Sequence, residues 1–514
     1  MSTQQKFLDS FDHVVVLMME NRSFDNVFGY LYDANQRNFS GAAGHWNKDP
    51  NTAQRIYTSP TATPHTPFPD PGEYMGNVLL QMFGEAFDGV NYNPVCTPTM
   101  DGFVSDYSAV LQDLTMVPPP FTWFGNPAET ATQIMQCQSV ETLPVLYKLA
   151  REFAIFDHWF CALPSATWPN RAFWHADTSY GFADNPSKKE GWKMLDWSLA
   201  SDCETLFDQL DKRFSNCDRN WTIYSDQLIP LTKFIHFGSM FDNWSTNNFR
   251  KLEYAKSGTS TFFDDCLNGA LPKYSFIEPH FLDYVDHGQW HNDMHPSKFL
   301  SAPHWILWGP GGPGSITLGD QLLLKVYEAI RRSPLRDRVL FVLAFDEHGG
   351  CYDHVPPGTA PPPSESTYYG GNREYDFDFT QLGPRVPMMM VSSFIPSQTI
   401  VSAELNHASF LAAMQQKWGL DALGPRQASA VSFAQEVPMT DGPREWEDLS
   451  GMHLDLPEMN DEQKQQVREN EDPLNDLQAS YFRAVRELGL VEGSSVETTK
   501  DAHQVLDVLH ETYR

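Results

Sequence analysis

A threonine stands where the sequence predicts the start of a helix, in the stretch ATWPNR at 166–171. Pro169 suits the first helical turn, because its missing N–H has no intrahelical partner there. Free backbone N–H groups and the helix dipole make such a terminus a natural phosphate site. A hydroxyl at Thr167 can attack phosphorus if a metal lowers its pKa, and Arg171 can hold phosphoryl oxygens with its planar guanidinium. The alternative is an ordinary threonine N-cap with a surface arginine.

A pair of carboxylates, Asp346 and Glu347, follows the apolar run at 339–345 directly. Adjacent carboxylates at a buried strand end are costly unless a cation compensates them, so the pair indicates a metal site. The two glycines that follow at 349 and 350 permit a tight turn and close approach of a ligand. An exposed acidic turn is the alternative.

The pair Glu20 and Asn21 follows another apolar run, at 14–19. Carboxylate and amide oxygens are hard ligands, and the hydroxyl of Thr167 with the carboxylates of Asp346 and Glu347 would complete an oxygen-rich set. Such a set favours one hard divalent cation, Ca²⁺ first, with Mg²⁺, Mn²⁺, Zn²⁺ and Fe as alternatives. Asn21 by itself is more often a turn or cap residue.

Two histidines are candidate proton donors to a leaving group or contacts to a phosphate. His295 lies in the stretch WHNDMHP at 290–296, and His354 follows the acidic pair by a few residues. A loop histidine is more often structural, and His407 is a weaker candidate. We therefore predict catalytic roles for Thr167, Asn170, Arg171, His295 and His354.

The elements that must position these residues alternate between strand and helix. Short, wholly apolar runs at 14–19, 339–345 and 386–391 are typical of buried parallel strands, and helices are expected near 320–332 and 407–418. This order predicts an α/β fold with a largely parallel sheet. Ligands bind beyond the carboxyl ends of such strands, so residues far apart in the chain are expected to form one site.

The chain divides by composition near residue 435. We expect a catalytic domain at 1–435 and an acidic, helical extension at 436–514, with helices near 461–469, 473–488 and 496–513. The extension is expected to be either a solvated appendage or a lid or regulatory tail over the site.

The net charge limits the classes of molecule that the protein is expected to bind. The sequence has 66 acidic and 36 basic residues, which gives a net charge of −30. Such a surface repels nucleic acid and anionic membranes, whereas a zwitterionic lipid or a small phosphate ester remains compatible, with at most peripheral membrane contact. The sequence leaves the oligomeric state open. No apolar run of about 18 residues and no secretory leader is evident. We expect a cytoplasmic protein, one exported by a non-classical route, or the mature form of a secreted one.

Seven cysteines form no C-x-x-C pair. Reduced thiols are the expected state in a chain of this length, and Cys203 with Cys217 is a conceivable disulfide.

Five ordered motifs resemble the bacterial phosphoesterases that include phospholipases C and a group of acid phosphatases. They are DHVVVLMMENRSFD at 12–25, MDGF at 100–103, LPSATWPNR at 163–171, NDMHP at 292–296 and FDEHGGCYDHVPP at 345–357. The resemblance spans about 11–420 and implies an alkaline-phosphatase-like three-layer α/β/α fold with long loop insertions. It also implies one metal bound by Glu20, Asn21, Thr167, Asp346 and Glu347, and a covalent phospho-enzyme on Thr167.

The sequence departs from this family pattern in two places. Residues 164–166 read PSA where the family usually has Pro-Gly-Pro, and the early loop at 70–73 reads DPGE where a Gly-His pair is expected. The second departure removes one histidine from the expected site.

The function expected is a phospholipase C that hydrolyses phosphatidylcholine-like lipids through a phosphothreonine. An acid phosphatase acting on soluble phosphomonoesters is the alternative. A sulfatase is disfavoured because threonine cannot become the required aldehyde, and a non-catalytic binding protein is disfavoured by the intact candidate residues. Four tryptophans, Trp123, Trp159, Trp168 and Trp174, are either a cage for choline or core packing.

Overall fold

The computed structural model describes most of the chain. The described residues are 2–33, 38–84, 87, 92, 96–116, 126–186, 194–217, 219–240, 248–254, 259–283, 288, 290–297, 312, 314–368, 374–454, 456, 458–491 and 496–513.

A mostly parallel sheet forms the centre of the molecule. In the described part of the chain it has eight strands, in the order β11-β4-β10-β9-β1-β8-β6-β7. These are β1 (His13–Met19), β4 (Ala154–Phe156), β6 (Trp221–Ser225), β7 (Phe249–Arg250), β8 (Tyr274–Glu278), β9 (Val339–Phe345), β10 (Met388–Val391) and β11 (Thr399–Val401). The remaining strands form two small sheets, β2 (Trp46–Lys48) with β3 (Arg55–Tyr57), and β5 (Trp159–Phe160) with β12 (Leu405–Asn406).

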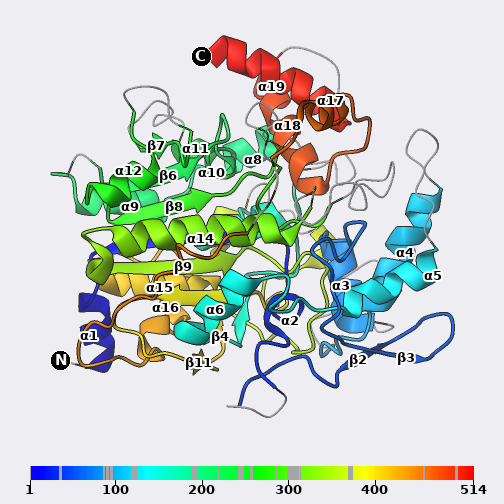
Figure 1. Ribbon diagram of the computed structural model, residues 1–514, viewed down its shortest axis with the longest axis horizontal. Coiled ribbons are helices and arrows are strands. Elements are labelled where there is room, and N and C mark those ends of the chain that lie inside the picture. Colours follow the sequence, from blue (N-terminus) through cyan, green and yellow to red (C-terminus); the bar gives the residue numbers. More distant parts are fainter. Residues whose placement is uncertain are drawn as a thin grey trace.

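Helices cover both faces of this sheet. The helices of the described residues, including those that lie away from the sheet, are α1 (Thr3–Asp9), α2 (Phe24–Phe28), α3 (Met75–Phe83), α4 (Phe103–Thr115), α5 (Pro127–Thr130), α6 (Pro144–Glu152), α7 (Thr167–Ala176), α8 (Met194–Ala200), α9 (Leu206–Arg213), α10 (Leu231–Ile235), α11 (Phe237–Met240), α12 (Phe262–Leu267), α14 (Ile316–Arg332), α15 (His407–Trp418), α16 (Pro425–Ser429), α17 (Asp461–Arg468), α18 (Asp476–Glu487) and α19 (Thr499–Tyr513). In Figure 1, α14 crosses in front of the strands and α15 lies behind them. The expected three-layer α/β/α architecture is confirmed.

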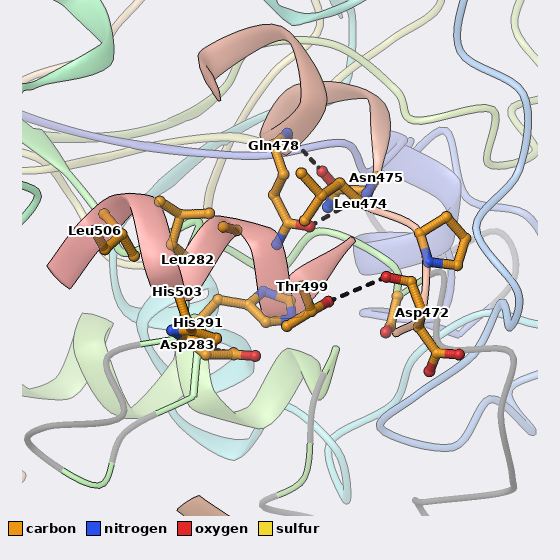
Figure 2. A pocket seen from close by; sticks show the side chains of 13 residues that line it. Leu282, Asp283, His291, Asp472, Leu474, Asn475, Gln478, Thr499, His503 and Leu506 are labelled. Atoms are coloured by element: carbon orange, nitrogen blue, oxygen red, sulfur yellow. Dashed lines mark hydrogen bonds between the residues drawn. The ribbon is translucent and has the colours of Figure 1, made fainter. Parts of the chain in front are cut away.

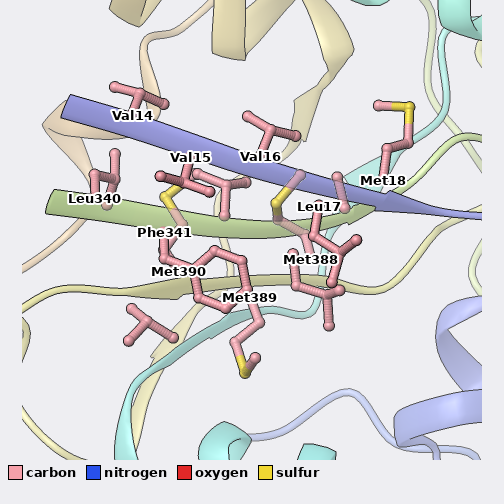
Figure 3. Close-up of a cluster of buried hydrophobic side chains, with 14 of the residues drawn as sticks. Val14, Val15, Val16, Leu17, Met18, Leu340, Phe341, Met388, Met389 and Met390 are labelled. Carbon is pink, nitrogen blue, oxygen red and sulfur yellow. The ribbon is translucent and has the colours of Figure 1, made fainter. Parts of the chain in front are cut away.

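The central strands are apolar throughout because helices bury both of their faces. Every residue from Val14 to Met19 and from Val339 to Phe345 is buried. Figure 3 shows side chains of β1 and β9 together with the methionines of β10, Met388 to Met390. The strands expected at 14–19 and 339–345 are therefore confirmed.

The third expected strand differs in its direction. The run at 386–391 forms β10 at Met388–Val391, which pairs antiparallel with both β9 and β4. A continuous apolar run shows that a strand is buried, but it does not distinguish the two directions. The helix expected after it is confirmed as α15, and the side chain of its N-cap Asn406 accepts a hydrogen bond from the backbone N–H of Ala408.

Part of the C-terminal region is packed against the body. The segment at 437–454 adds Val437, Trp446 and Leu449 to the main core, and Trp446 stacks on Tyr327 with ring centroids 5.4 Å apart. The helices α17, α18 and α19, grouped at the top of Figure 1, follow this segment. A boundary at 435 would therefore separate residues of one core.

The helix α18 packs against the helix that begins at Thr167. Its buried Leu477 and Tyr481 share an apolar cluster with Trp168, and Trp168 Nε1 donates to Ser480 Oγ at 2.9 Å. Figure 2 shows the cavity between α18, α19 and the loop carrying His291. Its volume is about 30 Å³, which suits one or two water molecules and not a lipid headgroup.

Two further expectations concern cysteines and membranes. All seven cysteines are free, so Cys203 and Cys217 form no disulfide. No described helix combines the length and the apolar character needed to cross a bilayer.

Shortening Leu477 to Ala should destabilise the fold, because Leu477 is fully buried between α18 and the body. We expect a loss of about 2–5 kcal/mol in the free energy of unfolding, measured by denaturant titration. Leu267→Ala is the matched control, since Leu267 is 69% exposed and should lose little. Equal effects of the two variants would contradict tight packing of the extension.

Candidate active site

Parallel pairing of two neighbouring strands brings the predicted acidic residues together. Met19 of β1 lies opposite Phe345 of β9, so the residues that follow, Glu20 and Asp346, leave the sheet at the same edge. The backbone N–H of Asn21 donates to Asp346 Oδ1 at 3.2 Å, and the N–H of Glu347 donates to the same oxygen at 2.8 Å.

The hydroxyl of Thr167 lies in this group. Thr167 is the first residue of α7, as predicted, and Ala166 is its N-cap. Its Oγ1 is 3.2 Å from Glu20 Oε2 and 3.4 Å from Asn21 Oδ1. The structure therefore brings the three segments together, although they are separated by more than a hundred residues.

Arg171, one turn along α7, connects the two acidic segments. Its Nε donates to Asp346 Oδ2 at 3.2 Å, and its Nη2 donates to Glu20 Oε1. Burial opposes the charged form, yet the carboxylates of Glu20 and Asp346 raise the pKa of Arg171 above its ordinary value. Within the described part of the chain, its buried Nη1 has no hydrogen-bond partner, so one donor remains for a phosphoryl oxygen.

Asn170 has a positioning role in the structure, and among the described residues no hydrogen bond joins it to the acidic group. Its Oδ1 accepts from the backbone N–H of Leu163 at 3.1 Å, and its Nδ2 donates to the carbonyl of Ser165 at 2.7 Å. The side chain thus holds the loop that leads into Thr167.

Glu347 lies in a tight turn that depends on glycine. The N–H of Gly349 donates to Glu347 Oε2 at 2.6 Å. Gly349 has φ +60°, and a Cβ there would meet the carbonyl oxygen of Asn21 at 2.0 Å. The turn therefore lets the backbone of Asn21 approach the acidic pair closely.

The five predicted ligands fit a divalent cation. Three carboxylates, Glu20, Asp346 and Glu347, are fully buried, and two of them, Glu20 and Asp346, pair with the guanidinium of Arg171. Glu347 Oε1 is buried and has no hydrogen-bond partner among the described residues. Burial raises the pKa of Glu20 and Glu347 well above the ordinary value, and neighbouring carboxylates add to the effect on Glu347. A bound cation would satisfy the free oxygen and reverse that electrostatic cost.

His295 lies among acidic residues that the sequence analysis did not select. Its Nδ1 is 3.8 Å from Asp70 Oδ1, and its Nε2 is 3.5 Å from Glu73 Oε2. Although burial lowers it, these carboxylates raise the pKa of His295 to about 10. Asn21 Nδ2 also donates to Glu73 Oε2, so the early loop contributes a carboxylate where the family pattern has a histidine. The glutamate at position 73, where the family pattern has a histidine, was the sequence signal that could have identified this acidic residue.

His354 belongs to a second cluster. Its Nδ1 is 2.7 Å from Asp25 Oδ2, its Nε2 is 3.4 Å from Ser40 Oγ, and its ring stacks on His45 at 3.7 Å. Arg385 donates to Asp25 from Nη2 and to Asp353 from Nε, each at 2.8 Å. Among the described residues, no hydrogen bond or ion pair joins His354 to the five predicted ligands.

His407 supports the acidic strand end. Its Nε2 is 2.7 Å from the carbonyl oxygen of Asp346, and its Nδ1 accepts from Trp159 Nε1 at 3.2 Å. Burial lowers the pKa of His407 to about 4, which matches a neutral ring that donates once and accepts once.

Of the four tryptophans, the three that the structure describes are core residues. Trp159, Trp168 and Trp174 are fully buried, and Trp174 stacks on Phe410 at 4.4 Å. Trp123 lies outside the described residues.

Comparison with known proteins gives a family match and named relatives. Residues 11–421 match the model described as the Phosphoesterase family. "Non-specific phospholipase C6" of Arabidopsis thaliana is 32% identical over 86% of this chain and 76% of its own length. "Phospholipase C B" of Mycobacterium tuberculosis is 23% identical over 80% of this chain and 74% of its own length. A solved protein "in the Alkaline Phosphatase Superfamily from Vibrio parahaemolyticus" is 12% identical, covers 58% of this chain and 66% of its own, and has a TM-score of 0.31.

Replacing Gly349 with Ala should disturb the site, because the added Cβ meets the Asn21 carbonyl and the backbone is left-handed. We expect a loss of about 2 kcal/mol or more in unfolding free energy by chemical denaturation. Gly442→Ala is the control, since nothing lies within 4 Å of the Cβ that it would add. An unchanged Gly349→Ala protein would rule out this close approach.

Proposed function

The chain belongs to the phosphoesterase family and is a hydrolase of phosphoester bonds, and from that premise we propose that it is a metal-dependent phospholipase C with Thr167 as its nucleophile. The observation that carries the proposal is the position of Thr167 Oγ1. The oxygen lies at the N-terminus of α7, 3.2 Å from Glu20 and 3.4 Å from Asn21.

The ligands of the proposed metal are Glu20, Asn21, Thr167, Asp346 and Glu347. All five side chains are buried and present oxygen atoms, which suits Ca²⁺ or another hard divalent cation. A divalent cation in such a site lowers the pKa of a hydroxyl and offsets negative charge on phosphoryl oxygens.

The proposed reaction begins at the threonine. Thr167 Oγ1 gives its proton to Glu20 Oε2, to which it donates a hydrogen bond at 3.2 Å, and forms a bond to phosphorus, while the bond from phosphorus to the leaving alcohol oxygen breaks and that oxygen takes a proton. Water then cleaves the phosphothreonine, which restores the hydroxyl and releases the phosphoryl headgroup.

Two features of α7 would stabilise the charge that develops on phosphorus. The first is its N-terminus, whose backbone N–H groups and dipole favour anions. The second is Arg171, whose Nη1 is buried without a described partner while Nε and Nη2 are held by Asp346 and Glu20. Donors fixed in this way cost no reorganisation when the charge appears.

Of the two predicted proton donors, we assign His354 to the leaving oxygen. Asp25 orients its ring through Nδ1, and 12% of its side chain is exposed, so it can exchange protons with solvent. His295 is fully buried and faces Asp70 and Glu73.

The proposed substrate is a zwitterionic, phosphatidylcholine-like phospholipid. Relatives from plants and bacteria are named phospholipases C, and a net charge of −30 disfavours anionic surfaces. A soluble phosphomonoester is the alternative, which a substrate panel with phosphatidylcholine vesicles and p-nitrophenyl phosphate would decide.

Thr167→Ala should lower turnover of phosphatidylcholine and of p-nitrophenyl phosphorylcholine by about 10⁴-fold or more, because no other group replaces the nucleophile. Steady-state kinetics measures the loss. Thr167→Ser is the control: it keeps a hydroxyl and should retain most activity. Unchanged turnover in Thr167→Ala would disprove the nucleophile assignment, and faster hydrolysis of aryl sulfate than aryl phosphate by the native enzyme would disprove the reaction class.

His354→Gln should show whether His354 protonates the leaving oxygen, because the loss of activity should depend on whether the leaving group needs a proton. Alkyl alcohols need a proton on departure, so turnover of phosphatidylcholine should fall by about 10²-fold or more. The p-nitrophenolate anion leaves without one, so p-nitrophenyl phosphorylcholine should be much less affected. Equal losses on both substrates would refute the assignment as proton donor.

A further inference from the structure

We propose that the hairpin formed by β2 and β3 is a docking surface for the headgroup region of a phosphatidylcholine bilayer. Its outer face carries Trp46, Lys48, Arg55 and Tyr57, all of them exposed. The proposal rests on the phospholipase C function proposed above and identifies the surface through which the enzyme reaches lipid in a membrane. None of these four residues belongs to the proposed catalytic machinery.

The outer face follows from the alternation of side chains along two short strands. The strands pair antiparallel, with Trp46 opposite Tyr57 and the two basic residues opposite each other. Successive side chains of a strand point to opposite faces of a sheet. The residues between them, Asn47 and Ile56, form the middle pair; Asn47 is buried and Ile56 is half-buried, so they make the inner face.

The inner face fixes the hairpin to the body of the protein. Asn47 Nδ2 donates to the carbonyl oxygen of Met100 at 2.9 Å, and its Oδ1 accepts from the backbone N–H of Val104 at 3.3 Å. Ile56 packs against the apolar cluster that contains these two residues. The outer face is therefore exposed because of its position in a packed hairpin, and not because the hairpin is detached.

The outer face places two large aromatic side chains in solvent. Tyr57 is 54% exposed and Trp46 is 39% exposed, and no other tryptophan, tyrosine or phenylalanine in the described part of the chain is as exposed as these. Tryptophan and tyrosine each combine an apolar ring with a polar N–H or O–H, and for this reason they are enriched where a membrane meets water. A cross-strand pair of the two is suited to that interface.

The charges of the outer face are complementary to a phosphocholine headgroup. Lys48 and Arg55 lie opposite each other, and the guanidinium carbon of Arg55 is 4.2 Å from the centre of the Trp46 ring. The stretch 45–58 has two basic residues and one acid, Asp49, whose carboxylate accepts hydrogen bonds within the turn. Basic side chains bind lipid phosphate, and aromatic faces attract the choline cation. A chain with a net charge of −30 thus presents a locally basic, aromatic surface here.

The hairpin is connected directly to the proposed proton donor. His45, which precedes Trp46 in the chain, stacks on His354 with ring centroids 3.7 Å apart. At the other end of the hairpin, the backbone N–H of Thr58 donates to the carbonyl oxygen of His45 at 3.0 Å. Figure 1 shows β2 and β3 extending outward at the lower right. A membrane bound to the outer face is thereby held on the side of the molecule where His354 lies.

Vesicle binding tests the surface directly. Full-length protein with Thr167→Ala leaves the lipid intact, and its binding to phosphatidylcholine vesicles is measured by co-sedimentation. Adding Trp46→Ala and Tyr57→Ala should weaken this binding by about tenfold or more, because two interfacial rings are lost. Leu267→Ala is the matched control and should bind as before, since Leu267 is 69% exposed but lies on α12, across the molecule in Figure 1.

Turnover in the enzyme that keeps Thr167 distinguishes docking from a structural role. The Trp46→Ala, Tyr57→Ala variant should hydrolyse phosphatidylcholine vesicles more slowly by a similar factor at low lipid concentration. Turnover of p-nitrophenyl phosphorylcholine should be unchanged, because a soluble ester needs no membrane contact. Unchanged vesicle binding, or equal losses on both substrates, would overturn the proposal. So would a native dimer that the variant dissociates in sedimentation velocity, because the outer face would then contact a second copy of the chain.

A milder variant keeps the test valid if the alanine variant fails to fold. Trp46→Phe retains an aromatic ring, and vesicles of brominated phosphatidylcholine should quench the fluorescence of the native protein more than that of Trp46→Phe. Equal quenching would overturn the proposal.

The outcomes also separate the docking surface from the proposed function. If the outer face binds vesicles but only p-nitrophenyl phosphate is hydrolysed, the surface stands and the phospholipase assignment fails. If the Trp46→Ala, Tyr57→Ala variant hydrolyses phosphatidylcholine vesicles at the native rate, the function stands and the surface is wrong.

Discussion

The contact between the guanidinium of Arg171 and the carboxylates of Glu20 and Asp346 is the interaction on which the site depends. Parallel pairing of β1 with β9 places both carboxylates at one sheet edge, where burial would disfavour their charge. Arg171 offsets part of that charge from α7, the helix that also presents Thr167. One helix therefore carries both the proposed nucleophile, Thr167, and the guanidinium of Arg171, so the two side chains keep their relative positions.

The two acidic clusters show that residue types alone do not determine chemistry. Both contain two carboxylates and one histidine. In one, Arg385 supplies the compensating charge to Asp25 and Asp353, and Asp25 orients the ring of His354. In the other, His295 lies beside Asp70 and Glu73, and these carboxylates raise its pKa to about 10, so the histidine itself supplies positive charge.

The C-terminal helices give the region near Thr167 a rigid support. Trp168, next to the proposed nucleophile, packs against α18 and donates a hydrogen bond from Nε1 to Ser480 Oγ. The proposed function requires a fixed backbone at this helix N-terminus, because small displacements of a reacting atom lower the reaction rate strongly. The C-terminal extension therefore packs behind the N-terminus of α7 and supports it.

The sequence by itself predicted the central strands β1 and β9 and five residues that the structure brings together, because these predictions depend on local patterns. Apolar runs predicted the two strands, and polar residues directly after them predicted Glu20 and Asp346. Only the tertiary structure decided the antiparallel direction of β10, the positioning role of Asn170 and the place of Glu73 beside His295. Those features arise from contacts between distant segments, whose free energy depends on packing and burial that no local spacing encodes.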